Sequence, residues 1–472
     1  MTSVAAAEHP DYGAPAMMKA RRSALSVPFA AQRLLAVIPV LAACFGAGCF
    51  LDTAGVDPVP GEVNFPTSIV IAPPPDAGVA PQFVYVFNSN FDLRYNGGTV
   101  MAIEIGAVAA AIDGPACDPK PCILATPSQF LAAGREVVTG SFPGGAAIST
   151  DGRRLYAPFR SDSSLTFIDV DPATGELSCQ LGGVTGGRCD EFHRRGDEAT
   201  ANLRGESMPG DPSRVLLQPR PAPLTGDFLV VLDRSGKASM FFDGTSAMPD
   251  VAPTLIDVID GLPASAVGLA YDAVAGVSYV SSADSRPSAR LARLGVAIDE
   301  PEPVRSYLFR AGEPRITGLD DGFDVRDLAF DGDRLYILSR RPEAVVFVDL
   351  RRAGLSSGDL PIERIISVDF GASRLKLATI GGRRFLFVTC YDGRTLFVID
   401  AQTGVVEDVV RGFSGPFEVA IDEFRNLAFV SDFRSSVVRV VDLRPLAAPG
   451  GSSLPIRIVA SIGTPRAPSE LN

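Results

Sequence analysis

Cysteines and recurring acid and arginine pairs are the residues best suited to chemistry in this 472-residue chain, since histidine is scarce and tryptophan is absent. Only His9 and His193 occur, so the supply of histidine excludes a His-rich zinc or iron site. We expect His193, beside two arginines and with no second histidine to join it, to be an exposed loop residue. No serine or cysteine is accompanied by a recognisable base, so we assign no catalytic residue and no cofactor.

Four of the seven cysteines have spacings that permit local disulfides. Cys117 and Cys122 flank a proline-containing turn, and Cys179 and Cys189 close a glycine-rich loop. The alternative for the first pair is redox chemistry, but C-x4-C is not the C-x-x-C motif and no βαβ pattern surrounds it. Cys390 lies among apolar strand residues and is expected to be a buried free thiol.

An acid and an arginine recur in the turn after the second apolar run of nearly every repeat unit. Alternating strand direction places these turns on one rim, which suits a carboxylate, a sugar or a charged protein loop because arginine grips anions with a fork of donors. The alternative is turn chemistry, since Asp, Asn and Ser favour turns for backbone reasons and exposed Arg–Asp pairs contribute little. The predicted binding rim consists of Asn88, Asn90, Asp92, Arg94, Arg160, Asp162, Asp233, Arg234, Asp284, Arg286, Arg340, Arg341, Tyr391, Asp392, Arg394, Asp432 and Arg434.

A weak calcium candidate lies within this rim. Asn88, Asn90 and Asp92 have the one-three-five spacing of oxygen ligands in calcium loops. No glycine follows at position six and no glutamate at position twelve, so a turn rich in Asx hydrogen bonds is the alternative.

The elements that must position these residues belong to a repeat. Residues 142–169, 325–349, 375–400 and 415–442 each contain three short β-branched and aromatic runs separated by turn residues, and weaker copies complete seven units between about 63 and 445. Several units carry a fourth run. Seven four-stranded units around an axis bury both faces of each sheet, so we predict an all-β, seven-bladed β-propeller. Residues 456–462 are expected to supply the strand that closes the ring.

The N-terminus has the features of an export signal, with basic residues, an apolar run of about ten residues and then small residues. Translation is expected to start at Met17 or Met18, because the preceding residues do not resemble a signal. The predicted organisation is a signal peptide over residues 1–43, a lipidated cysteine and flexible tether over 44–62, the propeller over 63–465 and a C-terminal tail over 466–472.

The end of the apolar run, Leu41-Ala42-Ala43-Cys44, resembles a bacterial lipobox, in which the cysteine is lipidated and anchors the protein to a membrane. Cys49 is the alternative, although it lacks a large aliphatic residue three positions earlier. No aspartate follows either cysteine, which in the sorting rule for such lipoproteins favours the outer membrane. A net charge of −12 disfavours a nucleic-acid partner.

The repeat resembles the YVTN family of β-propeller repeats, and the lipobox with a propeller resembles deltaproteobacterial envelope lipoproteins. The resemblance covers about 380 residues and implies the fold more than a function, since related propellers include lactonases, lyases and binding proteins. We expect an exported, membrane-anchored lipoprotein that serves as a non-catalytic binding or assembly scaffold, with another envelope protein as its partner. The alternative is a periplasmic, lactonase-like hydrolase that uses rim carboxylates and Ca²⁺.

Overall fold

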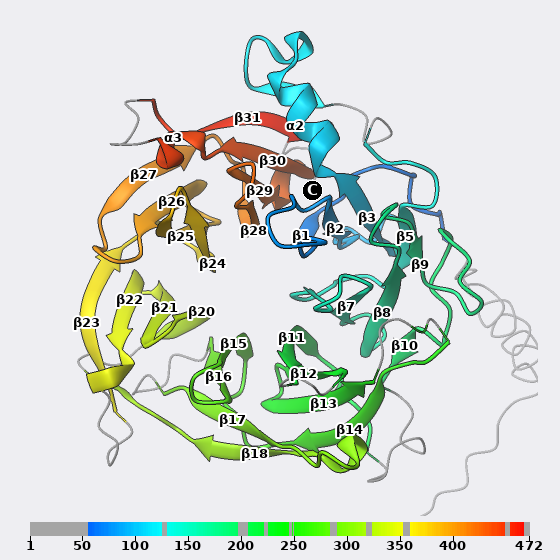
Figure 1. Cartoon of the computed structure of the whole chain (residues 1–472), viewed down its shortest axis with the longest axis vertical. Coiled ribbons are helices and arrows are strands. Elements are labelled where there is room, and N and C mark those ends of the chain that lie inside the picture. The colour runs from blue at the N-terminus through cyan, green and yellow to red at the C-terminus, as the bar shows by residue number, and fades with distance from the viewer. Residues whose placement is uncertain are drawn as a thin grey trace, which may run out of the picture. The chain divides into compact units, whose positions relative to one another are not determined.

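Seven antiparallel sheets are arranged as blades around a central channel (Figure 1), which confirms the predicted seven-bladed propeller. The computed structural model describes residues 55–124, 130–196, 206–220, 225–244, 248, 250–283, 290–317, 323–352, 359–448 and 454–466. The expected signal peptide, Cys44, Cys49, Asp284 and Arg286 lie outside the described residues. Within these ranges no helix is long and apolar enough to cross a membrane.

In blades 1 to 3 the first strand of each blade lies at the channel. Blade 1 contains β1 (Pro66–Ile71), β2 (Phe83–Asn88), β3 (Gly98–Glu104) and β5 (Glu136–Thr139). Blade 2 contains β6 (Ala147–Ile148), β7 (Arg154–Phe159) and β8 (Ser164–Val170), with β9 (Leu177–Ser178) and β10 (Arg194–Arg195) both paired to β8. Blade 3 contains β11 (Pro212–Pro219), β12 (Asp227–Asp233), β13 (Lys237–Asp243) and β14 (Thr254–Ile259).

Blades 4 to 7 repeat this plan. Blade 4 contains β15 (Ala266–Asp272), β16 (Val277–Ser282), β17 (Ala292–Ala297) and β18 (Tyr307–Gly312). Blade 5 contains β20 (Asp324–Asp331), β21 (Arg334–Arg341), β22 (Glu343–Asp349) and β23 (Leu360–Ser367), and β19 (Ile316–Thr317) pairs with β23. Blade 6 contains β24 (Ala372–Ile380), β25 (Arg383–Cys390), β26 (Thr395–Asp400) and β27 (Val406–Arg411). Blade 7 contains β28 (Pro416–Asp422), β29 (Leu427–Asp432), β30 (Val437–Asp442) and β31 (Arg457–Ile462).

Short helices connect some of these strands. Among the described residues the α-helices are α2 (Ile105–Asp113) and α3 (Arg444–Ala447). The 3-10 turns are η2 (Pro115–Cys117), η4 (Pro303–Arg305), η5 (Leu350–Arg352) and η6 (Phe433–Ser435).

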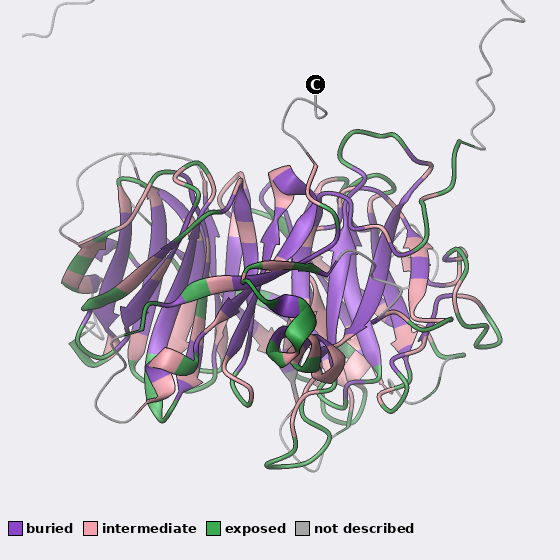
Figure 2. Cartoon of the chain, turned by 90° about the horizontal axis from the view of Figure 1, so that it is seen from above, coloured by how far each residue is buried: buried purple, intermediate pink, exposed green. Residues whose placement is uncertain are grey.

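The core is divided into apolar layers between neighbouring blades, which Figure 2 shows as buried strands across the ring. In β12, Phe228 and Val230 pack with blade 4, whereas Leu229 and Val231 pack with blade 2. Successive strand residues point to opposite faces. A continuous apolar run such as β12 therefore has to be covered on both sides, and only its neighbouring blades can cover it.

A segment between β3 and β5 completes the ring. Its strand β4 (Cys122–Leu124) pairs in parallel with β31, and Ile105, Val108 and Ile112 of α2 join the apolar layer shared by blades 7 and 1. Residues 456–462 were expected to supply the closing strand; they contain β31, which is the fourth strand of blade 7. β31 leaves one edge free, and β4 from the N-terminal side occupies that edge.

Candidate functional site

A one-residue irregularity interrupts the innermost strand of six blades at the same level of the channel. Such bulges twist a strand and redirect a side chain. The residues at this level line one mouth of the channel, together with Gly144 at the corresponding place in blade 2; they are Thr67, Ser213, Val267, Arg326, Ser373 and Phe417. The next position along each strand forms a deeper layer.

That deeper layer contains two ion pairs, which we call the channel belt: Arg214 with Asp327 and Arg374 with Glu418. Arg214 donates to both carboxylate oxygens of Asp327, and Nε of Arg374 lies 3.2 Å from Oε2 of Glu418. Burial lowers the pKa of Arg214, but the charges of Asp327 and Glu418 outweigh burial and raise it. Burial and the neighbouring Arg214 lower the pKa of Arg374. The belt separates the mouth from the opposite half of the channel.

Five arginines line the mouth, and one of them, Arg374, belongs to the belt. They are Arg160, Arg234, Arg326, Arg340 and Arg374. Asp211 is shared between Arg160, whose Nε donates to it, and Arg234, whose Nε is 4.0 Å away. Asp392 is likewise shared, because Nη2 of Arg340 lies 2.8 Å and Nη2 of Arg434 lies 3.6 Å from its oxygens. Each shared carboxylate therefore leaves one positive charge uncompensated.

A continuous aromatic wall faces the same mouth. Phe433 is its centre, with ring centroids 5.1 Å from Phe65, 5.3 Å from Phe91 and 6.1 Å from Tyr391. Phe142 extends the wall beyond Phe91 at 6.2 Å. Aromatic rings at these separations attract one another. The wall therefore presents a fixed flat apolar surface beside the arginines.

Together these groups enclose a cavity of about 400 Å³ at the mouth. This volume is within the range of small-ligand sites, which combine apolar walls with a few fixed polar groups. On the other side of the belt the channel holds about 940 Å³ and is lined mainly by apolar residues of the innermost strands. Of the two cavities, the mouth concentrates arginines and aromatic rings, so it is the candidate binding site.

Some of the predicted rim residues lie at the mouth in the structure, and others do not. Arg160, Arg234, Arg340 and Tyr391 line the mouth. Asp392 and Arg434 reach it through ion pairs, and Arg434 also lies over the Tyr391 ring at 4.6 Å.

Two predicted acids have a structural role instead. Asp233 is buried and accepts the backbone N–H groups of Asp211 and Ser235. Asp432 is fully buried and accepts backbone N–H groups of Ser414 and Gly415. The turn interpretation describes the contacts of Asp233, whereas Asp432 also pairs with Arg439, whose Nε lies 3.0 Å from its Oδ2.

The remaining predicted rim residues lie away from the cavity lining. Asp162 lies 3.7 Å from Arg194 and accepts a hydrogen bond from Ser164. Arg94 lies over the ring of Tyr95. Arg341 is exposed, and Arg394 is exposed in the turn between β25 and β26.

The calcium candidate does not present a free set of oxygen ligands. The amide oxygen of Asn88 accepts the N–H of Asn64, and that of Asn90 accepts the N–H of Tyr95. Asp92 accepts the N–H of Arg94 from an exposed position. Only the Asp92 bond has the two-residue spacing of an Asx turn, and the amide oxygens of Asn88 and Asn90 are engaged by more distant N–H groups. Among the described residues, no three His, Cys, Asp or Glu side chains converge as a metal-binding group.

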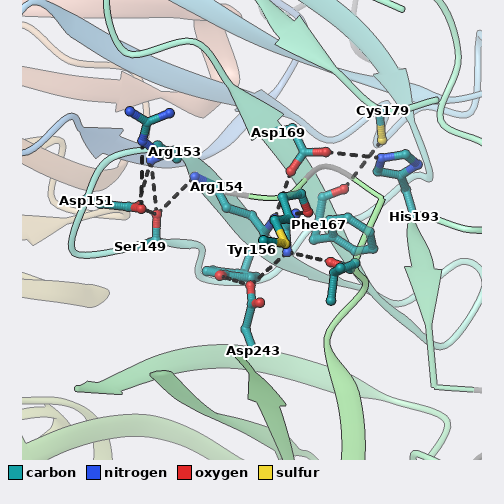
Figure 3. Close-up of polar contacts among 12 residues, drawn as sticks. Ser149, Asp151, Arg153, Arg154, Tyr156, Phe167, Asp169, Cys179, His193 and Asp243 are labelled. Atoms are coloured by element: carbon teal, nitrogen blue, oxygen red, sulfur yellow. Dashed lines mark hydrogen bonds and ion pairs between the residues drawn. The ribbon is translucent and has the colours of Figure 1, made fainter. Parts of the chain in front are cut away.

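His193 was expected to be exposed, and this expectation is wrong: its side chain is buried between blades 2 and 3. Its Nδ1 lies 2.7 Å from Asp190, its Nε2 lies 3.5 Å from Asp169, and its ring stacks near Phe167 (Figure 3). The physical reason is that β10 pairs with β8, so the insertion folds back over the blade.

Arg154 joins this buried cluster to blade 3 (Figure 3). The fully buried guanidinium donates to Asp169 at 2.8 Å, to Asp243 at 3.0 Å and to backbone carbonyls of residues 248 and 251. The hydroxyl of Tyr156 also donates to Asp243, at 2.5 Å. Burial lowers the pKa of Arg154, but Asp243 and Asp169 outweigh burial and raise it. The cluster lies away from both cavities and connects two blades.

The predictions of two disulfides and a buried free thiol are confirmed. Cys117–Cys122 and Cys179–Cys189 are disulfides, and Cys390 is a buried free thiol whose pKa burial raises to about 12. The two disulfides are typical of an exported protein.

Sequence reasoning did not single out Arg326, Arg374, Phe142 and Phe417 as mouth residues. Arg326, Arg374 and Phe417 lie near the start of innermost strands, where the bulge changes which side chains face the channel, and Phe142 precedes β6. Aligning the units at the residue before each bulge would have placed Arg326 and Phe417 at equivalent positions.

No protein-family model matches this chain, and no curated protein sequence matches it. Among solved structures, the periplasmic gluconolactonase PpgL of Pseudomonas aeruginosa is 15% identical, covers 73% of this chain and 84% of its own, and has a TM-score of 0.48. A putative 6-phosphogluconolactonase of Bacteroides fragilis is 12% identical over 82% of this chain and 92% of its own, with a TM-score of 0.47. The β-propeller domain of Myceliophteria thermophila Cps50 (Swd1) is 11% identical over 80% and 96%, with a TM-score of 0.48. These values support no inference about activity, and the assignment of this chain as a seven-bladed propeller rests on its own sheets.

Proposed function

We propose that this chain is a lipid-anchored propeller of the bacterial cell envelope, of the YVTN-repeat type, that acts as a non-catalytic binding scaffold for another envelope protein. The observation that carries the proposal is the channel mouth, where exposed arginines and aromatic rings are held on a rigid ring of blades. Rigid presentation of aromatic and arginine side chains is characteristic of binding hot spots.

The mouth favours binding over hydrolysis because its carboxylates are already engaged. A general base or metal ligand needs a carboxylate that can reach the substrate or ion. Asp392 and Asp211 pair with arginines, whereas Asp233 and Asp432 accept backbone N–H groups. No observation on the described residues favours the lactonase-like alternative.

The membrane anchor is the second part of the proposal. It is supported by the lipobox-like sequence ending at Cys44 and by the two disulfides, which are typical of exported proteins. Cys44→Ala is expected to release the protein from the outer-membrane fraction into the soluble fraction. Retention of a lipidated protein would identify Cys49 as the anchor, and a wild-type protein without lipid would refute the anchor.

Photo-cross-linking in intact cells tests the scaffold role. A photoreactive phenylalanine analogue replaces Phe91, which is 57% exposed at the mouth. Phe424, 58% exposed and lining the opposite cavity, provides a matched control. We expect one envelope protein to be linked reproducibly at position 91 and not at position 424. Equal labelling at both positions, or only self-links at good coverage, would refute the proposal.

A further inference from the structure

We infer that the channel mouth binds a carboxylate that is attached to an aromatic group, either a free aromatic acid or the C-terminal aromatic residue of a protein. This inference rests on the proposed binding function and specifies the chemistry of the ligand. Three features of the mouth support it: its charge, its aromatic wall and its closed floor.

The charge of the mouth favours an anion. The five lining arginines and Arg434 face four carboxylates, namely Asp211, Asp324, Asp392 and Glu418, which leaves two positive charges uncompensated. This local excess is notable in a chain whose net charge is −12. Guanidinium groups match the two oxygens of a carboxylate with parallel donors.

The uncompensated charges lie where an incoming ligand can reach them. The Arg234 side chain is 40% exposed and only 4.0 Å from its nearest carboxylate, and that of Arg340 is 34% exposed. Neither guanidinium is fully used by the pairs described above. A ligand carboxylate would therefore add contacts without first breaking a buried ion pair.

The aromatic wall selects what the anion carries. Arg234 belongs to blade 3, whereas Phe91 and Phe433 belong to blades 1 and 7, which lie across the channel from it (Figure 1). Arg160 and Arg340 belong to blades 2 and 5, on the flanks between them. Phe91 contacts Phe433 but remains 57% exposed, so one edge of the wall is open to a ligand ring. A ring stacked there and a carboxylate directed across the channel would satisfy both halves of the mouth.

The channel belt sets the depth of the site. Arg374 and Glu418 close the floor with their ion pair, and both side chains are largely buried. A ligand therefore cannot pass into the larger cavity without separating buried charges, which is costly. The volume of about 400 Å³ above this floor suits one aromatic residue with its carboxylate.

Isothermal titration of the folded chain tests the ligand class with four probes. N-acetyl-phenylalanine carries both the ring and the carboxylate, its amide lacks the charge, and N-acetyl-alanine lacks the ring. A hexapeptide that ends in phenylalanine with a free carboxylate represents the protein source. We expect both ring-bearing carboxylates to bind about tenfold or more tightly than the other two, because hydrogen bonds to a charged group are stronger than those to a neutral group. Tighter binding of the hexapeptide assigns the ligand to a protein terminus, and equal binding assigns it to a free acid.

Variants locate the binding at the mouth. Arg234→Gln and Phe91→Ser are each expected to weaken the binding of N-acetyl-phenylalanine about tenfold. The first removes a contact to the carboxylate of the ligand, and the second removes a contact to its ring. Arg394→Gln, on the same rim but outside the lining, and Phe424→Ser, on the opposite face, are the matched controls and should bind as wild type. Because Arg234 and Phe91 are exposed, their replacement should leave the unfolding midpoint unchanged, which is checked first.

The ligand class is wrong if the amide binds as tightly as the acid, if neither mouth variant weakens binding, or if no probe binds at millimolar concentration. These outcomes are separate from those of the cross-linking. A partner linked at position 91 without carboxylate binding would keep the scaffold and refute the ligand class. Carboxylate binding without a cross-linked partner would keep the ligand class and refute the scaffold.

Discussion

Replacing Arg154 by methionine should be among the most destabilising single changes in the interface between blades 2 and 3. Methionine keeps much of the apolar stem but leaves Asp169 and Asp243 without the buried cation that contacts them at 2.8 and 3.0 Å. Removing one partner of a buried ion pair costs about 3–5 kcal/mol, because the remaining charge is desolvated without compensation. The bonds to two backbone carbonyls are lost as well. We therefore expect a loss of unfolding free energy of about 3–5 kcal/mol.

Urea unfolding of the variant measures this loss, and hydrogen exchange shows where it acts. Arg153→Met is the matched control, since Arg153 is exposed and only 4.0 Å from Asp151. This control should change stability by less than about 0.5 kcal/mol. Adding Asp243→Asn to the Arg154→Met variant should recover part of the loss, because it removes a buried charge. If the free energies of unfolding of Arg154→Met and Arg153→Met differ by less than about 1 kcal/mol, the interpretation that Arg154 stabilises the contact between blades 2 and 3 is wrong.

Three further perturbations test other features. Burial and the charge of Asp243 raise the pKa of Asp227 from 3.8 to about 6, so its ionisation opposes folding as pH rises through that value. Asp227→Asn should raise the free energy of unfolding at pH 8 by about 1 kcal/mol, after discounting for solvent screening, and leave it unchanged at pH 4; an equal change at both pH values would contradict this. The Cys390 thiol, buried with its pKa raised to about 12, should react with a maleimide only after denaturation, and rapid labelling of the native protein would contradict its burial. Replacing Cys179 and Cys189 together by serine should cost about 2–3 kcal/mol in urea unfolding, since their short loop is then free in the unfolded chain, and an unchanged midpoint would contradict a stabilising role.

The architecture was predictable because its signal is local. Runs such as Phe385–Val388 are apolar at every position, and this pattern requires cover on both faces wherever it occurs. Phe385 and Phe387 do pack with blade 7 while Leu386 and Val388 pack with blade 5. Seven sheets that each need cover on both faces can all be covered when they are arranged as neighbouring blades in a closed ring.

The site was predictable only in part, because residue type does not reveal what a side chain bonds to. Asp392 and Asp432 lie in corresponding turns, yet the first reaches arginines at the mouth, whereas the second is buried and bonds to backbone N–H groups and to Arg439. Arg374 was missed for a different reason. The bulge before it changes the alternation of β24, and a bulge leaves little trace in a single sequence.

The pairing of β4 with β31 has a consequence for how the chain is made. Cys117 of the closing segment contacts the backbone of Val459, 342 residues further along. A protein synthesised and exported from its N-terminus therefore holds β4 as an unpaired edge until the last blade has emerged, and unpaired edges favour aggregation. A chain that stops before β31 would lose this pairing altogether. The pairing of β4 with β31 can therefore form only in a chain that has been made as far as β31.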